Sequence, residues 1–192
     1  SKKGSVPEHD PLPVATVLTL PAAGSENSPN TVLSDEATGR KLGFKHMGLR
    51  PALSIVDPTL FLTLPREQMA YGACDMRCHL FERYFTNTKD VEVTDRMIEA
   101  LLLTMINEAP KVIADPNNYE ARANIMWAGM MAHNNSCGVG RSQDWASHDI
   151  EHELSAVYDC AHGAGLAVTF PAWMTYNMNR SEERRVGKEC EG

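Results

Sequence analysis

The feature that most constrains the fold of this chain is a set of acidic and imidazole side chains carried by stretches with helical apolar patterning. Asp75 and His79 lie four residues apart in the first stretch, and residues four apart share one face of a helix. The second stretch and its continuation contribute His148, His152 and His162. One carboxylate with two or three imidazoles is a ligand set that iron, zinc or manganese accepts. The sequence therefore predicts helices that face one another around a divalent metal ion.

Charge and composition exclude several classes of protein. The 192 residues are 43% hydrophobic and 22% charged, as in a globular domain, and the formal net charge is −7. An acidic chain without a basic patch is a poor partner for nucleic acid or for an anionic membrane. Five cysteines, an odd number without Cys-x-x-Cys spacing, come with no signal peptide, so we expect a reducing cytoplasm.

Two regions of different composition meet near Asp57-Pro58. Before this point, β-branched and apolar runs bounded by turn residues predict strands, including a hairpin around the turn-rich residues 34–39. After it, apolar residues at helical spacing predict helices that begin near residues 65, 94, 118, 144 and 162. We expect Pro110 to kink or end the second helix. The sequence thus predicts a mostly helical α+β chain, divided into residues 1–58 and 59–179.

Both ends of the chain are atypical of a complete natural protein. Residues 1–13 carry three prolines and scattered charge, which indicates an extended lead-in. Residues 180–190 change abruptly to a polar, charge-dense string that resembles a translated sequencing adapter. We therefore expect an internal fragment of a longer gene, with residues 180–192 derived from an artefact. A genuine solvated helix is the alternative.

Spacing alone does not decide which histidines of the second stretch bind the ion. Residues 148–152 also fit His-x-x-Glu-His, a zinc metallopeptidase signature in which both histidines bind zinc and the glutamate is the general base. That short pattern leaves Asp75, His79 and His162 without roles, so we rank the peptidase second. Gly24 and Ser25 belong to a loop of small residues that could approach a phosphate, although a plain surface turn is the simpler interpretation.

Four strings in this chain closely resemble the iron-containing alcohol dehydrogenase family, in its NAD(P)H-dependent butanol dehydrogenase branch. They are Thr16-Val-Leu-Thr-Leu-Pro-Ala-Ala-Gly-Ser-Glu26, Asp75-x-x-x-His79, Asp144-Trp-Ala-Ser-His148-Asp-Ile-Glu-His-Glu-Leu154 and Tyr158-Asp-Cys-Ala-His-Gly-Ala-Gly-Leu166. The likeness runs in order from about Val14 to Tyr176. It implies a dehydroquinate synthase-like architecture, in which the end of an α/β dinucleotide-binding domain precedes an all-helical metal-binding domain, both incomplete here.

The resemblance also implies roles for individual residues. Asp75, His79, His148 and His162 match the family's metal ligands, and His152 matches a nearby histidine that can relay a proton or order the substrate. The family's cofactor loop corresponds to Thr16, Thr19, Gly24 and Ser25, whereas its glycine-rich pyrophosphate loop should lie upstream of Ser1.

The activity implied by this resemblance is hydride transfer between NAD(H) or NADP(H) and a short- to medium-chain alcohol or aldehyde such as butanol or butanal. Iron is the family's usual metal, and the same ligands accept zinc or manganese. The complete protein would be a homodimer without nucleic-acid or membrane partners. The remaining alternative is a metal-binding helical fragment without catalytic activity.

Overall fold

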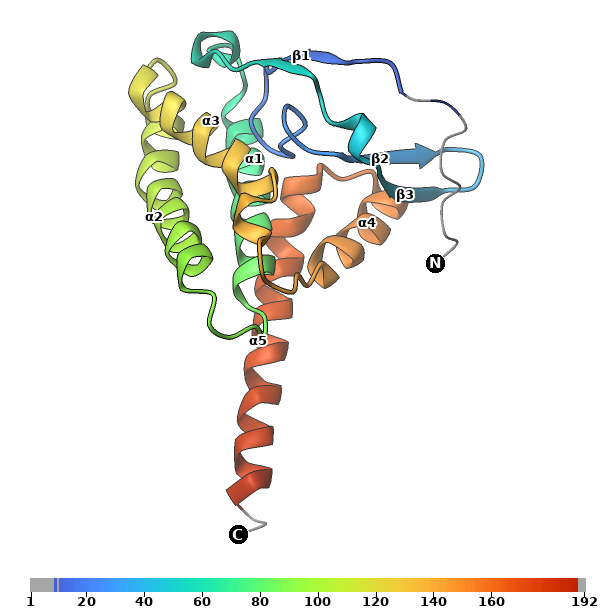
Figure 1. Ribbon diagram of the computed structural model, residues 1–192, viewed down its shortest axis with the longest axis vertical. Helices are drawn as coiled ribbons and strands as arrows, with labels where there is room; N and C mark the ends of the chain where they lie inside the picture. The colour runs from blue at the N-terminus through green and yellow to red at the C-terminus, as the bar shows by residue number, and fades with distance from the viewer. Residues whose placement is uncertain (1–8, 10, 190–192) are drawn as a thin grey trace.

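The computed structural model describes residue 9 and residues 11–189, with side chains described up to residue 178. Short strands come first and long helices follow (Figure 1). The strands are β1 (Ala15–Val17), β2 (Asn30–Asp35), β3 (Arg40–Lys45) and β4 (Leu53–Ile55). The helices are α1 (Arg66–Tyr84), α2 (Glu92–Ala114), α3 (Tyr119–His133), α4 (Ala146–Tyr158) and α5 (His162–Glu189). This order confirms the expected mostly helical α+β class.

Helix α1 contacts α2, α3 and α5, and the main apolar core lies between α1, α2 and α3. Met76 and Leu80 of α1, Ile98 and Met105 of α2 and Ile125 of α3 are fully buried in it. Burying each such side chain contributes about 1.5–3 kcal/mol to folding. Apolar residues from three helices therefore form the interior of this region.

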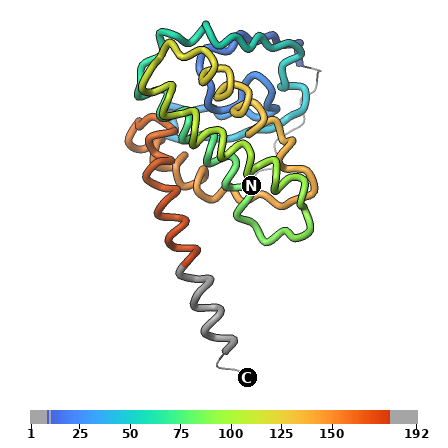
Figure 2. The backbone as a smooth tube through the Cα atoms, turned by 90° about the vertical axis from the view of Figure 1, so that its left-hand side faces the viewer, coloured from blue at the N-terminus to red at the C-terminus, as the bar shows by residue number. Residues whose placement is uncertain are grey.

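Helix α5 packs its first turns along α1 through a smaller apolar cluster. Phe81 of α1 stacks on Phe170 of α5 with the ring centroids 5.3 Å apart, and Leu166 is fully buried beside Cys78. Figure 2 shows residues before 58 at one end of the molecule and α5 running toward the other end. The side of α1 away from the main core is thus covered by the helix that begins at His162.

The strands form two separate pairs. β1 pairs with β4 in parallel, with Thr16 opposite Ser54, and β2 pairs with β3 as an antiparallel hairpin. The hairpin confirms the turn expected at residues 34–39. Lys41 of β3 donates a hydrogen bond of 2.8 Å to the hydroxyl of Ser155, and this places the hairpin beside α4.

Two glycines allow other segments to lie directly on α1. A Cβ atom added at Gly72 would lie 2.3 Å from the carbonyl oxygen of Pro21, and one added at Gly163 would lie 2.2 Å from the carbonyl oxygen of Tyr71. Contacts this short with backbone atoms leave no room for a side chain. The loop after β1 and the start of α5 therefore converge on the same turns of α1.

Pro110 does not end the second helix, because α2 continues to Ala114. The expectation that this proline ends the helix is therefore wrong. The preceding turn loses one hydrogen bond at the proline, but Ala109 and Val112 are buried against the core and hold both sides of it. Tertiary packing outweighs the local preference here.

Three further observations concern the described part of the chain. No helix in it combines the length and apolar character that crossing a membrane requires. Cys74, Cys78, Cys137 and Cys160 are free thiols. The backbone of α5 continues as a helix through residues 180–189, and the side chains there lie outside the described set.

Candidate metal centre

Asp75 and His79 lie on the inner face of α1, where both side chains are almost completely buried. The Nε2 atom of His79 lies 3.1 Å from Oδ1 of Asp75. This contact follows from helix geometry, because side chains at positions i and i+4 lie one above the other. The first helix thus presents one carboxylate oxygen and one imidazole nitrogen to the same point.

Two more imidazoles reach the same carboxylate oxygen from other helices. The Nε2 atom of His148, in the first turn of α4, lies 3.4 Å from Asp75 Oδ1, and the Nε2 atom of His162, the first residue of α5, lies 3.7 Å from it. The structure therefore brings together all four residues that the sequence nominated as ligands. Asp75, His79 and His148 each offer a ligand atom within 4.8 Å of the other two.

The spacing of these atoms suits a small divalent ion. Metal–ligand bonds of about 2.1 Å place neighbouring ligands of a tetrahedral site about 3.4 Å apart. The three oxygen-to-nitrogen distances, 3.1, 3.4 and 3.7 Å, are centred on that value. Asp75 Oδ1 and His148 Nε2 are buried and lack a hydrogen-bond partner, a costly state that a bound cation would relieve. The residues present fit a metal ion.

The electrostatics of the cluster favour positive charge. Burial alone would raise the pKa of Asp75, yet the imidazoles of His79, His148 and His162 outweigh it and hold that pKa well below its usual range. Burial would likewise lower the pKa of His148, but the adjacent carboxylates of Asp75 and Glu82 raise it to about 9. Two buried carboxylates next to His148 therefore attract either a proton or a metal cation.

Several residues that sequence reasoning did not single out surround this cluster. His133, the last residue of α3, stacks on the ring of His79 with centroids 3.9 Å apart. The Arg83 guanidinium donates hydrogen bonds to the backbone carbonyls of His79 and Ala132, and it lies 4.6 Å over the ring of Trp145. Arg83 is four residues after His79, so helical spacing could have found it; His133 is distant in sequence and offered no such signal.

Two buried glutamates, Glu82 and Glu151, were not predicted from the sequence as residues of this site. Glu82 contacts Nδ1 of His148, and Glu151 contacts Nδ1 of His162. Both carboxylates are fully buried. The second contact removes the peptidase alternative, because the glutamate of a His-x-x-Glu-His site must be free to take a proton from water, and Glu151 is already engaged by His162.

His152 occupies a separate position, one turn after His148 on α4 and half-buried. Its ring centroid is 6.3 Å from that of His148 and 5.3 Å from that of His162. Burial, together with the nearby His162 and Lys41 side chains, lowers the pKa of His152 to about 4. The ring is therefore neutral near pH 7, at the edge of the buried cluster.

The residues expected to contact a dinucleotide lie in β1 and in the loop after it. The hydroxyl of Thr16 donates to Ser54 at 2.8 Å and so joins the two parallel strands, whereas Thr19 and Ser25 are exposed. Gly24 is buried with a left-handed φ of 62°, and a Cβ atom there would lie 2.7 Å from Cβ of His133. Gly24 thus lies directly against His133, which stacks on His79.

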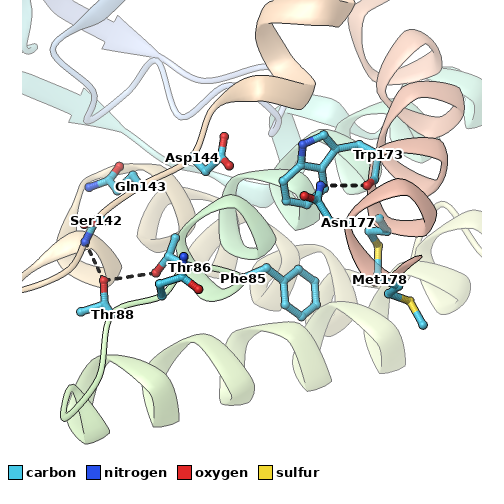
Figure 3. A pocket seen from close by; sticks show the side chains of 11 residues that line it. Phe85, Thr86, Thr88, Ser142, Gln143, Asp144, Trp173, Asn177 and Met178 are labelled. Carbon is cyan, nitrogen blue, oxygen red and sulfur yellow. Dashed lines mark hydrogen bonds between the residues drawn. The ribbon is translucent and has the colours of Figure 1, made fainter. Parts of the chain in front are cut away.

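A cavity of about 1000 Å³ opens elsewhere, between the α1–α2 connection, the segment before α4, and α5 (Figure 3). Its wall combines polar side chains such as Thr88, Ser142 and Asn177 with the rings of Phe85 and Trp173. None of the candidate metal ligands lines it. The cavity and the histidine cluster are therefore distinct features of the helical region.

Comparison with known proteins gives consistent matches along the chain. Residues 69–188 match the sequence model of the Fe-containing alcohol dehydrogenase family, C-terminal part, and residues 1–58 match that of the iron-containing alcohol dehydrogenases. The chain is 44% identical over 184 residues to a probable NADH-dependent butanol dehydrogenase of Bacillus subtilis, covering 96% of this chain and 47% of that protein. Identity to the NADPH-dependent aldehyde reductase YqhD of Escherichia coli is 40%, covering 90% of this chain and 44% of that one.

Solved structures agree with the sequence matches. The crystal structure of NADH-dependent butanol dehydrogenase A from Thermotoga maritima superimposes with a TM-score of 0.84 at 44% identity, covering 86% of this chain and 42% of that one. The chain spans about half the length of the curated relatives it matches.

Proposed function

Because the chain belongs to the iron-containing alcohol dehydrogenase family, we propose that it carries the metal centre of an NAD(P)(H)-dependent alcohol dehydrogenase or aldehyde reductase. Relatives named as butanol dehydrogenases and as an aldehyde reductase support a short- to medium-chain alcohol or aldehyde, such as butanol or butanal, as the substrate. The observation that carries the proposal is the approach of three imidazole Nε2 atoms to one buried carboxylate oxygen, Asp75 Oδ1.

Asp75, His79, His148 and His162 would hold the ion. The family favours Fe²⁺, and the mixed nitrogen and oxygen donors also suit Zn²⁺ or Mn²⁺. When bound, the ion supplies Lewis acidity toward the alcohol or carbonyl oxygen, and the nicotinamide exchanges the hydride. Burial of Asp75 and His79 excludes water from the inner side of the site, so a ligand can enter only from the half-buried side, where His162 lies.

We propose that His152 exchanges the alcohol proton with solvent. Its ring lies next to His162 on the half-buried side of the cluster. A neutral imidazole can accept a proton and pass it to water, and the lowered pKa of His152, about 4, keeps it in the accepting form near pH 7. We assign to it the proton-relay role, without a bond to the ion.

The loop after β1 would hold the nicotinamide end of the dinucleotide. Gly24 packs directly on His133, which in turn stacks on His79. A side chain at Gly24 would push the loop away from α3, so glycine there keeps the loop close to the metal centre. Thr16, Thr19 and Ser25 would contact the cofactor along the rest of this segment.

Metal binding by the purified chain tests the ligand set directly. Under anaerobic conditions we expect one Fe²⁺ per chain by elemental analysis, or one Co²⁺ with the visible absorption of a low-symmetry site. The Asp75→Ala/His162→Ala double variant should bind none. An unchanged stoichiometry in a folded double variant would contradict the ligand set.

The two histidines one turn apart on α4 should behave differently. We expect His148→Ala to abolish metal loading and His152→Ala to retain it, because only His148 lies against Asp75. In an active enzyme, His152→Ala should instead slow butanal-dependent oxidation of NADH or NADPH. Loss of metal in His152→Ala would overturn the separation of roles, and a metal-loaded protein without hydride transfer would favour the non-catalytic alternative.

A further inference from the structure

Glu82 joins the end of α1 to the start of α4. One carboxylate oxygen contacts Nδ1 of His148, and the other accepts hydrogen bonds from the Ser147 hydroxyl and, at 3.1 Å, from the backbone N–H of His148. Trp145, the residue that precedes α4, makes no side-chain cap, so this N–H would otherwise lack a partner in the first turn. Glu82 thus caps α4 from another helix while it contacts the ring of the residue it caps.

Glu151 makes the equivalent contact one turn later. It lies three residues after His148 on α4, is fully buried, and contacts Nδ1 of His162 on α5. The opposite side of its carboxylate is closed by Gly165, where an added Cβ atom would lie 2.6 Å from Glu151 Oε1. The Oε2 atom of Glu151 forms a hydrogen bond with Nδ1 of His162, so a carboxylate oxygen faces this ring nitrogen as it does in the Glu82–His148 pair.

A carboxylate oxygen accepts hydrogen bonds, so the Nδ1 atom that faces each of these glutamates carries the proton. The neutral ring then has its lone pair on Nε2. In both residues Nε2 faces Asp75 Oδ1, at 3.4 Å for His148 and 3.7 Å for His162. Each glutamate therefore selects the tautomer in which the nitrogen next to Asp75 is free to bind a cation.

On this geometry, and building on the proposed metal centre, we propose that Glu82 and Glu151 are the positioning residues of the site, which hold His148 and His162 as Nδ1–H tautomers with Nε2 turned to the ion.

The ring of His79 is held by stacking on other rings and not by a carboxylate. Within the described residues its Nδ1 atom is buried without a hydrogen-bond partner. Its ring lies instead between those of His133 and His148, with centroid distances of 3.9 and 4.9 Å. Stacking restrains the plane of a ring but does not select a tautomer. The two glutamates therefore orient the proposed ligands of α4 and α5, which are His148 and His162.

Glu151, His152 and His162 also lie close enough to one another, within 4.8 Å, to hold an ion themselves. That use would require Glu151 to give up its contact with Nδ1 of His162. The two roles differ in a measurable way. A positioning residue changes affinity and leaves one ion per chain, whereas a ligand of a second ion changes the number bound.

The test uses Glu82→Gln and Glu151→Gln, which keep the size of each side chain and remove its charge. Exposed glutamates on the same helices provide matched controls, Glu67→Gln on α1 and Glu153→Gln on α4. Co²⁺ affinity is measured by competition with a chelator, with helix content checked by circular dichroism. We expect each buried variant to bind Co²⁺ about 10- to 100-fold more weakly at an unchanged stoichiometry of one, and the controls to match the parent chain.

Affinities within twofold of the parent in both folded buried variants would overturn the proposal, as would two ions per parent chain with one lost in Glu151→Gln. Nitrogen-15 NMR of the metal-free parent chain provides a second readout that does not need the variants to fold or the ion to bind. His148 and His162 should carry protons on Nδ1, with or without a proton on Nε2, and rings protonated on Nε2 alone would contradict the role of the glutamates. Failure of the parent to bind Co²⁺ would instead count against the proposed function.

Discussion

The strands before residue 58 and the helices after residue 65 bury their apolar side chains to very different degrees. Ile98 and Met105 of α2 are completely buried, whereas Leu33 of β2 and Leu53 of β4 are 67% and 62% exposed. Within the described residues each strand pairs with one neighbour, and most side chains of all four strands are exposed. The apolar content of a segment therefore does not measure how much it stabilises the fold.

The strand region is attached to the helices mainly through its loop. Leu18, Glu26 and Ser28 are almost completely buried although they follow β1, and Pro21 lies on Gly72 of α1. The backbone N–H of Leu18 also bonds to the carbonyl of Ile55. The segment nominated for cofactor contact is therefore better buried than the strands on either side of it.

Hydrogen exchange should show the largest contrast between the two regions. We expect amides in the middle of α1 and α3 to exchange at least about 1,000-fold more slowly than those of β1 and β4, because local opening of a two-stranded pair exposes little buried surface. Exchange followed by mass spectrometry on peptides from each element measures this. Equal protection of strands and helices would show that the regions unfold as one unit.

Truncating a buried side chain in the helices should lower the free energy of unfolding far more than truncating an exposed side chain in the strands. Ile98→Ala should lower the free energy of unfolding by about 3 kcal/mol, because it leaves a cavity between α1, α2 and α3. Leu33→Ala, at an exposed strand position, should change it by less than about 0.5 kcal/mol. Urea denaturation of both variants gives the two values, and similar losses would mean that the hairpin is buried in solution.

A Gly→Ala substitution tests how closely the loop after β1 packs on α1. Gly72→Ala should destabilise the chain by about 2 kcal/mol, since its Cβ would meet the Pro21 carbonyl oxygen at 2.3 Å and the loop must shift. Gly43→Ala in β3 is the control, because nothing lies within 4 Å of a Cβ atom there. If Gly72→Ala and Gly43→Ala have the same thermal unfolding midpoint, the loop does not pack against α1.

The smallest expected effect concerns a buried charge in the loop. Burial raises the pKa of Glu26, so the folded chain takes up a proton at a higher pH than the unfolded chain does. Stability from this group is then present at low pH and is lost as the pH rises through the folded-state pKa. Glu26→Gln should accordingly stabilise the chain by on the order of 1 kcal/mol at pH 8.

The stabilisation by Glu26→Gln should become smaller as the pH falls toward the usual pKa range of a glutamate side chain. Denaturation midpoints at pH 8 and near pH 4 provide the measurement, and Glu36→Gln, at an exposed position before β3, is the control variant. A stabilisation that is the same at both pH values would mean that the Glu26 charge is not the cause.

Helical spacing and turn chemistry were enough to predict the elements and to pair Asp75 with His79, whereas the choice of His148 came from the resemblance to the family. Asp75 and His79 could be paired from sequence because an α-helix fixes which residues four apart share a face. The same rule could not choose between His148 and His152, since both lie on one face of α4 and the choice depends on which end of that helix faces α1. Spacing from His79 could have indicated both Glu82 and Arg83, which follow it by three and four residues, but it could not show that Glu82 would contact His148 on α4.

The sequence by itself determined the order of strands and helices and the presence of a carboxylate and imidazoles suited to a divalent metal, because both depend on local periodicity and on side-chain chemistry. Only the tertiary structure decided that Glu82 contacts Nδ1 of His148 and that Glu151 contacts Nδ1 of His162. It also decided that His133 stacks on His79 and that the apolar side chains of the strands remain exposed. Those outcomes depend on the mutual placement of α1, α3, α4 and α5, which comes from packing between residues far apart in sequence. No local pattern encodes such packing.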